Sequence, residues 1–307
     1  MIQKFFQNLV LSALILMGAG SARGANDELP PLPALTQPAN DTRIPGKFIW
    51  ADLFTSEVDA ARQFYAATFG WEWRWVIQHP VHGYGMFYAE GRAVAGVAHY
   101  PNPETGKPYA RWIHYLSVAD VKSAAGDTVA RGGRVLLDRR NIPHRGDFAV
   151  VADPEGAPFG VLHSSTGDPP DYQTQIGEWL WEGLFSRDAD AASKFYASLF
   201  GYEIYGPGDG ADILEYVLAA GGYSRAGIGQ LRAESDSKPT WLGFVRVDDV
   251  GATVERARGA GGEVLHERDP EDPEGHLAIV ADPFGAVIGL MKWTYEDAEP
   301  ADAEASP

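Results

Sequence analysis

The chain contains an internal repeat, and this repeat constrains its fold more than any other feature of the sequence. Matching residues lie 131 positions apart in the first part of each copy and 129 apart further on. The matched pairs are Trp50 with Trp181, Tyr65 with Tyr196, Gly96 with Gly227, Trp112 with Trp241, Asp120 with Asp249, and Asp153 with Asp282. Self-similarity at a fixed period indicates duplication. We therefore expect one domain at 46–164 and a second at 177–294, joined by a linker at 165–176.

Each copy contains a smaller pattern twice: an apolar strand, a helix, and then three short strands. In the first copy the strand FIWADLFT leads to Ser56, which has the chemistry of a helix N-cap, and Gly70 stands where a C-terminal cap is expected. The strand RWIHYLSV is followed in the same way by a helix that starts at Asp120. The sequence therefore predicts an α+β fold built from four βαβββ modules.

The two ends of the chain are predicted to lie outside these domains. Residues 1–24 combine a Lys, a short apolar run and small residues, which is typical of a secretory signal peptide; an uncleaved anchor is the alternative. Residues 25–45 are rich in proline and are expected to form a linker without a core. Residues 295–307 are acidic and are expected to form a disordered tail. The mature protein is therefore expected in the periplasm or outside the cell, without a membrane partner.

Composition excludes several classes of function. The 307 residues carry a net charge of −17, which would repel a phosphate backbone, so nucleic acid is not expected as a partner. The chain has no cysteine, so disulfides, thiolate catalysis and cysteine-type metal sites are excluded.

Several short motifs carry a resemblance to a known family. They are W-x-D-L before the first helix, FYAATFGW, VAG, GGRV, and ADPEGAPFG with its counterpart ADPFGAVIG. In these motifs the chain resembles the vicinal oxygen chelate superfamily, which includes glyoxalase I, bleomycin-resistance proteins and extradiol dioxygenases. The resemblance covers almost all of residues 46–294. Within the superfamily, the chain is similar to tandem two-domain members. It implies paired βαβββ modules that curve into an open, barrel-like groove.

The resemblance also implies where a metal ion would be held. Metal-dependent members use side chains of the first and last strands of each module, with the first-strand ligand about seven residues before the helix start. Those places hold Trp50, Ile113, Trp181 and Leu242 on the first strands, and Gly96, Gly160, Gly227 and Gly289 on the last strands. None of these side chains is a metal ligand, so the usual site is predicted to be missing and no cofactor is expected.

A displaced site for a divalent metal is the alternative. His99, His114 and His163 fall on three predicted strands at equivalent or neighbouring places. Strand alternation argues against it, because it turns His114 and His163 to the face opposite the groove.

Alternation instead predicts an aromatic groove around one carboxylate. Trp50, Asp52 and Phe54 share the groove side of their strand, and Tyr115 and Ser117 face them from a neighbouring strand. Such a groove suits an apolar or planar organic ligand with a donor or positive group. Burial would raise the pKa of Asp52, which makes it a candidate general base or cation anchor. The alternative is that tryptophan fills the groove and Asp52 pairs with an arginine or a backbone amide.

The second copy keeps Trp181 as a candidate ligand contact, but its acid, Glu182, is one residue out of the register of Asp52. Three hypotheses follow. The protein binds a small organic molecule without metal; or it is a lyase, isomerase or dioxygenase that uses displaced ligands or Asp52 as base; or it is a structural module with filled grooves. Whether it is an enzyme stays open, and so does the choice between monomer and homodimer.

Overall fold

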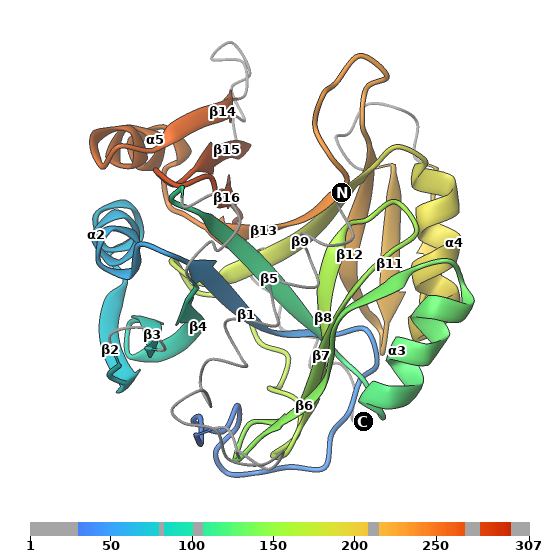
Figure 1. Cartoon of the computed structure of the whole chain (residues 1–307). Coiled ribbons are helices and arrows are strands. Elements are labelled where there is room, and N and C mark those ends of the chain that lie inside the picture. Colours follow the sequence, from blue (N-terminus) through green and yellow to red (C-terminus); the bar gives the residue numbers. More distant parts are fainter. Residues whose placement is uncertain (1–29, 80–82, 101–106, 208–214, 268–276, 296–307) are drawn as a thin grey trace, which may run out of the picture.

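A computed structural model describes residues 30–79, 83–100, 107–207, 215–267 and 277–295 of the chain (Figure 1). The predicted signal peptide, residues 25–29 and the acidic tail after Tyr295 lie outside these ranges. Among the helices in the described ranges, none has both the length and the apolar character of a membrane span.

The first domain consists of two successive strand–helix–strand–strand–strand modules, as predicted. The first module contains β1 (Phe48–Thr55), α2 (Val58–Phe69), β2 (Glu72–Ile77), β3 (Tyr84–Ala89) and β4 (Arg92–His99). The second contains β5 (Ala110–Ser117), α3 (Val121–Ala130), β6 (Arg134–Ile142), β7 (Gly146–Ala152) and β8 (Pro158–Ser164).

The second domain repeats this order. Its first module contains β9 (Trp179–Ser186), α4 (Ala189–Phe200), β10 (Glu203–Tyr205), β11 (Tyr216–Ala220) and β12 (Tyr223–Gln230). Its second contains β13 (Thr240–Arg246), α5 (Val250–Gly259), β14 (Glu263–Glu267), β15 (Leu277–Ala281) and β16 (Val287–Met291).

The helix ends follow local sequence, with one exception. Gly70 ends α2 in the left-handed conformation (φ 75°), where a residue without Cβ is favoured. Asp120 caps α3 by accepting a 2.6 Å hydrogen bond from the amide of Ser123. The prediction of Ser56 as the cap of α2 is wrong: the cap position is Glu57, and the Ser56 hydroxyl accepts a hydrogen bond from the amide of Tyr109.

Each domain forms one open eight-stranded sheet rather than a closed barrel. The strand order is β2-β3-β4-β1-β5-β8-β7-β6 in the first domain and β10-β11-β12-β9-β13-β16-β15-β14 in the second. The first strand of each module in the first domain runs parallel to the last strand of the same module, and β1 and β5 pair antiparallel. This is the predicted α+β architecture of paired βαβββ modules.

The two domains pack against each other in a crossed manner. Helix α2 of the first domain lies beside α5 of the second on one side of the molecule, and α3 lies beside α4 on the other (Figure 1). One hydrophobic cluster accordingly combines α2 residues such as Ala61 and Phe64 with α5 residues such as Val254 and Ala257. The duplicated halves therefore share cores, and neither buries its helices alone.

A matched pair of buried hydrogen-bond chains crosses this interface. Trp112 Nε1 donates to Tyr65 Oη (3.0 Å), and that hydroxyl donates to Asp282 Oδ2 of the other domain (3.3 Å). The repeat supplies the equivalent chain with the two domains exchanged. Trp241 Nε1 donates to Tyr196 Oη (2.9 Å), and that hydroxyl donates to Asp153 Oδ2 of the first domain (3.1 Å). Three matched pairs of the repeat, namely its Trp112/Trp241, Tyr65/Tyr196 and Asp153/Asp282 positions, therefore belong to the interface.

Each of these aspartates also holds the turn before the last strand of its module. Asp153 Oδ1 accepts 2.8 Å hydrogen bonds from the amides of Gly156 and Ala157. Asp282 Oδ1 does the same for Phe284 and Ala286. Each of the two carboxyl groups therefore fixes a turn within its own domain and contacts a tyrosine of the other domain.

The segments expected to be linkers are instead packed on the domains. Leu32 is buried in a hydrophobic cluster of the first domain, and its amide donates to Pro143 O (3.1 Å). In the 165–176 segment, the buried Asp168 accepts hydrogen bonds from Ser117 Oγ (2.8 Å) and the amide of Ile44 (2.6 Å). A proline-rich segment can be either a mobile linker or an ordered segment, because proline restricts the unfolded chain in both cases. Composition alone therefore does not distinguish the two. We call residues 30–45, which pack on the first domain, the N-terminal strap.

We predict that Asp153 gives the fold a distinct pH dependence. Burial raises the pKa of its carboxyl to about 6, while its hydrogen bonds act in the opposite direction. The usual value in an unfolded chain is about 3.9, so the folded state favours the protonated form. The stability that the folded state gains from this preference is fully present below about pH 4 and is lost as pH rises through about 6. The loss lowers the free energy of unfolding by about 3 kcal/mol.

Urea unfolding of the wild type and Asp153→Asn between pH 4 and pH 7 tests this. The wild type should lose stability relative to the variant as pH rises through that range, because asparagine does not ionise. Asp138→Asn, a change at an exposed residue of β6, is the control and should give a curve parallel to the wild type. Parallel curves for Asp153→Asn as well would contradict the prediction.

Candidate ligand-binding site

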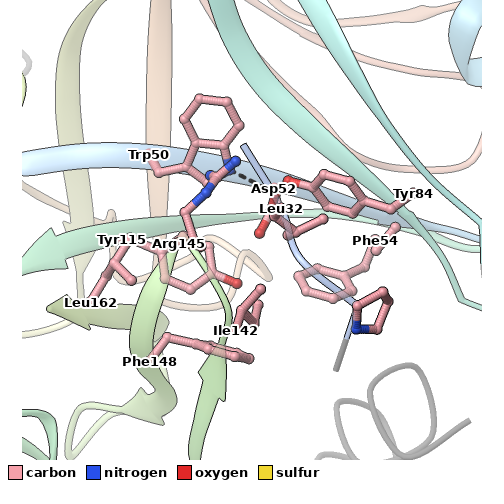
Figure 2. A pocket seen from close by; sticks show the side chains of 12 residues that line it. Leu32, Trp50, Asp52, Phe54, Tyr84, Tyr115, Ile142, Arg145, Phe148 and Leu162 are labelled. Atoms are coloured by element: carbon pink, nitrogen blue, oxygen red, sulfur yellow. Dashed lines mark hydrogen bonds between the residues drawn. The ribbon is translucent and has the colours of Figure 1, made fainter. Parts of the chain in front are cut away.

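A cavity lies on the face of the first domain's sheet toward which alternate residues of β1 point. Trp50, Asp52 and Phe54 enter it from β1, as strand alternation predicts, and Tyr115 enters from β5 (Figure 2). The remaining lining residues are Pro30, Leu32, Tyr84, Ala98, Ile142, Arg145, Phe148 and Leu162. Counted together with its opening to solvent, the free space is about 540 Å³.

Asp52 is the buried carboxylate of this cavity. Its Oδ1 accepts a hydrogen bond from Trp50 Nε1 (2.8 Å) and another from Tyr84 Oη (2.7 Å). Burial raises the pKa of Asp52 above its usual value, because desolvation disfavours the charged form. The positive charge of Arg145 and the hydrogen bonds, including one from Tyr115, act in the opposite direction.

Trp50 forms a wall of the cavity and does not fill it. Its indole nitrogen is held by Asp52, and the guanidinium of Arg145 lies over its ring at 4.3 Å from the ring centre (Figure 2). This distance is that of a cation–π contact. Arg145 reaches the cavity from the turn between β6 and β7, and its Nε donates to Pro33 O (2.9 Å). The turn therefore connects the N-terminal strap to the wall of the cavity.

The structure brings together four of the predicted site residues and separates two. Trp50, Asp52, Phe54 and Tyr115 all line the cavity. Ser117 is not among the lining residues, because its hydroxyl donates to Asp168. Trp181 lies in the second domain, against a separate cluster.

Sequence reasoning missed Tyr84, Arg145 and Leu32. Tyr84 could have been found, because β3 pairs with β4 and the alternation of YGMFYA turns Tyr84 toward the same side as Met86. Arg145 lies in a turn and Leu32 in a strap, and neither has a periodic pattern that shows which way its side chain points.

The strand register shows which first-strand residues lie beside the last-strand glycines. In the parallel pair of β1 and β4, Gly96 lies beside Asp52, two residues after Trp50. In β5 and β8, Gly160 lies beside Tyr115 rather than Ile113. At these two pairs the last strands carry glycine, and the first strands carry Asp52 and Tyr115.

The glycines at these places make room for the side chains beside them. A Cβ on Gly96 would lie 2.1 Å from Asp52 Oδ1 and 1.8 Å from Tyr84 Oη. A Cβ on Gly160 would lie 2.1 Å from the ring of Tyr115. The space that a ligating side chain would need is occupied by the hydrogen-bonded network around Asp52.

The same register in the second domain leaves no oxygen or nitrogen donor at these places. Gly183 pairs with Gly227, and Phe244 pairs with Gly289. The neighbouring acid, Glu182, is buried on the other face of β9, where its Oε1 lies 2.8 Å from Nδ1 of His114 in the first domain. This distance between Glu182 and His114 is that of an ion pair, but the two groups are not oriented for a hydrogen bond at Nδ1.

The histidines proposed as displaced metal ligands do not converge. His114 is buried between the domains, with its ring 4.9 Å from that of Trp179. The His163 ring contacts the carbonyl of Val118 (3.0 Å), and His99 lies beside Thr55 in the β1–β4 pair. Within the described ranges, no three histidine, aspartate or glutamate side chains are close enough together to hold a metal ion. The residues present therefore do not fit the divalent ion that the family resemblance implies.

Comparison with protein families now places the chain. The model of the "Glyoxalase/Bleomycin resistance protein/Dioxygenase superfamily" matches it twice, at residues 47–161 and 178–290. The chain belongs to this superfamily. It is the superfamily that the motifs indicated, and each match corresponds to one of the eight-stranded sheets.

Two relatives match most of the chain. The chain is 30% identical to a "Putative glyoxylase CFP32" of Mycobacterium bovis, over 79% of this chain and 93% of that protein. It is 31% identical to the "Anthracycline biosynthesis protein DnrV" of Streptomyces peucetius, over 81% of this chain and 94% of that protein.

Solved structures show the same fold at low identity. A Mn(II)-bound glyoxalase from Novosphingobium aromaticivorans is 14% identical, with a TM-score of 0.54, over 81% of this chain and 83% of that one. A homoprotocatechuate 2,3-dioxygenase variant from B. fuscum is 13% identical, with a TM-score of 0.55, over 87% of this chain and 76% of that one. These two neighbours share the fold with the chain.

We predict that Gly96 is required for the Asp52 network. In Gly96→Ala the new methyl group would displace Asp52 and Tyr84, so we expect a loss of about 1–3 kcal/mol in the free energy of unfolding. Gly126→Ala in α3 is the control, since nothing lies within 4 Å of its Cβ, and it should gain up to about 1 kcal/mol. Urea unfolding of both variants measures the difference; equal stability of the two would show that the close approach at Gly96 is not required.

Proposed function

We propose that this protein binds a small, planar organic ligand in the cavity of its first domain, without the divalent metal used by other members of the superfamily. The observation that carries the proposal is the buried Asp52 carboxylate, which stands beside Gly96 at the family's metal-ligand place and is held by Trp50 and Tyr84.

The walls of the cavity support a planar ligand. Trp50, Phe54, Tyr84, Tyr115 and Phe148 all contribute aromatic surface to one space. Small-molecule sites are commonly lined by apolar and aromatic side chains with a few polar groups that fix orientation. Flat rings stack on such walls with more contact area than saturated rings of the same size.

The relatives support a link to small-molecule chemistry. DnrV is named as an anthracycline biosynthesis protein and CFP32 as a putative glyoxylase, and the chain covers almost the full length of each. Both names concern small organic molecules rather than macromolecules.

An enzyme that uses Asp52 as a general base is the second candidate. Burial raises the pKa of this carboxyl, which makes it a stronger base than an exposed aspartate. Its Oδ1 already accepts two hydrogen bonds, so a proton would have to be taken by Oδ2. A lyase or oxygenase with displaced metal ligands has less support, because His99, His114 and His163 lie apart.

The cellular setting belongs to the same proposal. The composition of residues 1–24 supports export to the periplasm or beyond, and the net charge of −17 argues against nucleic acid as a partner. Because the two halves already pack on each other, the chain has within itself the kind of pairing that could otherwise require a second copy, which favours a monomer over a homodimer.

We predict that 2-naphthol and quinoline bind the protein and that the saturated trans-2-decalol binds at least about tenfold more weakly, since it cannot stack on Trp50. Fluorescence titration and the shift in Tm measure binding. Trp50→Ala should lose the affinity for the planar compounds. No binding of any planar compound would contradict the proposal and favour a filled groove.

Asp52→Asn separates binding from catalysis. Asparagine keeps an oxygen that can accept from Trp50 and Tyr84, so we expect ligand affinity to change by less than about threefold. If the protein turns over a bound compound, the variant should bind it but no longer convert it. Equal loss of affinity and conversion would instead make Asp52 a ligand anchor.

We predict that divalent metals do not stabilise the protein. Protein purified without chelators should hold less than one ion per chain, and added Mn²⁺, Fe²⁺ or Zn²⁺ should leave its Tm unchanged, because no three histidine, aspartate or glutamate side chains converge within the described residues. A stoichiometric ion that is lost in Asp52→Asn would contradict this.

A further inference from the structure

Arg145 has an unused donor in the wall of the cavity. Its side chain is buried, at 3% exposure, and its Nε is occupied by Pro33 O. Its Nη2 is sealed from solvent and has no hydrogen-bond partner among the described residues. Buried donors without a partner are rare, because each forgoes its hydrogen bonds to water.

The charge of Arg145 has no direct counterpart either. Within the described residues, no carboxylate oxygen forms an ion pair with it at 4.0 Å or less. Asp52 is close enough for its charge to interact with that of Arg145, but its Oδ1 is taken by Trp50 and Tyr84. Trp50 connects the two groups: its ring face carries the guanidinium, and its nitrogen donates to the carboxylate.

The chemistry of a guanidinium identifies the missing partner. Arginine has donors only and stays charged, so it is complemented by an oxygen acceptor, and best by an anionic one. Because the guanidinium lies over Trp50, an acceptor at Nη2 would be placed beside the aromatic walls. The sequence-based expectation of a donor or positive group fits less well, since Asp52 is already supplied with donors.

We propose that the ligand is a planar conjugated compound that carries an anionic oxygen, and that Nη2 of Arg145 donates to this oxygen while the ring packs beside Trp50. This inference rests on the proposed function and specifies the ligand class for the same cavity. A carboxylate and an ionised enol present the same chemistry to Arg145, and the experiment below distinguishes them.

Two matched pairs of compounds test the inference on the wild-type protein. The first pair is 2-naphthoate and its neutral amide, 2-naphthamide. The second is 2-hydroxy-1,4-naphthoquinone, which is ionised at neutral pH, and its methyl ether, which is not. Calorimetric titration at neutral pH should show the anion of at least one pair binding about tenfold or more tightly than its neutral partner. The pair that shows the preference identifies the carboxylate or the enolate as the source.

Arg145→Gln should abolish this preference while leaving the affinity for the neutral compounds within about threefold, because the ring contacts remain. Arg139→Gln is the matched control: Arg139 lies on β6 in the same hairpin, is exposed, and pairs with Asp147 (2.6 Å) outside the cavity. It should keep the wild-type preference.

Other outcomes overturn the inference in distinguishable ways. Equal affinities within both pairs would reject the anionic ligand but leave the proposed planar ligand standing. An unchanged preference in Arg145→Gln would reject Arg145 as its source. Failure of all four compounds and of 2-naphthol to bind would reject the proposed function as well. If Arg145→Gln does not fold, the comparison of anionic and neutral compounds on the wild-type protein still decides whether the ligand is anionic.

Discussion

The fold depends on two buried carboxyl groups that each act on both domains. Asp153 and Asp282 hold the turns before β8 and β16, and each contacts a tyrosine from the opposite half of the chain. Because the tyrosines lie on α4 and α2, the contacts fix which helix packs beside which and so join the two sheets. With the helices packed between the domains, the opposite face of the first sheet is left to form the cavity.

Within that face, a hydrogen-bonded carboxylate lies beside Gly96, one of the last-strand places where the family resemblance implies a metal ligand. The parallel register of β1 and β4 puts Asp52 beside Gly96, and the missing side chain there leaves space for the hydroxyl of Tyr84. Two neutral donors satisfy Oδ1 without an ion. The glycine at this last-strand place therefore leaves room for a hydrogen-bonded acidic group where a ligating side chain would otherwise stand.

The sequence predicted the parts of this arrangement that depend on local periodicity. Strand alternation predicted that Trp50 and Asp52 share one face, and both line the cavity; the repeat predicted the modules. Periodicity does not give the register between strands, so it could not show that the last-strand glycines Gly96 and Gly160 lie beside Asp52 and Tyr115. Arg145 and Leu32 were missed for a different reason: a turn and a strap acquire their direction from tertiary contacts, namely Arg145 Nε to Pro33 O and Leu32 N to Pro143 O.

The two copies differ at positions that face each other across the interface. At the centre of the interface, His114 and Glu182 face each other, and the equivalent positions of the opposite copies hold Gly243 and Ala51. A Cβ on Gly243 would lie 2.4 Å from the His114 ring, so the small residue of one copy accommodates the large residue of the other. The copies have thus become different where they meet. Because Glu182 faces the interface, no acid remains on the groove side of β9, and this strand has no counterpart of Asp52.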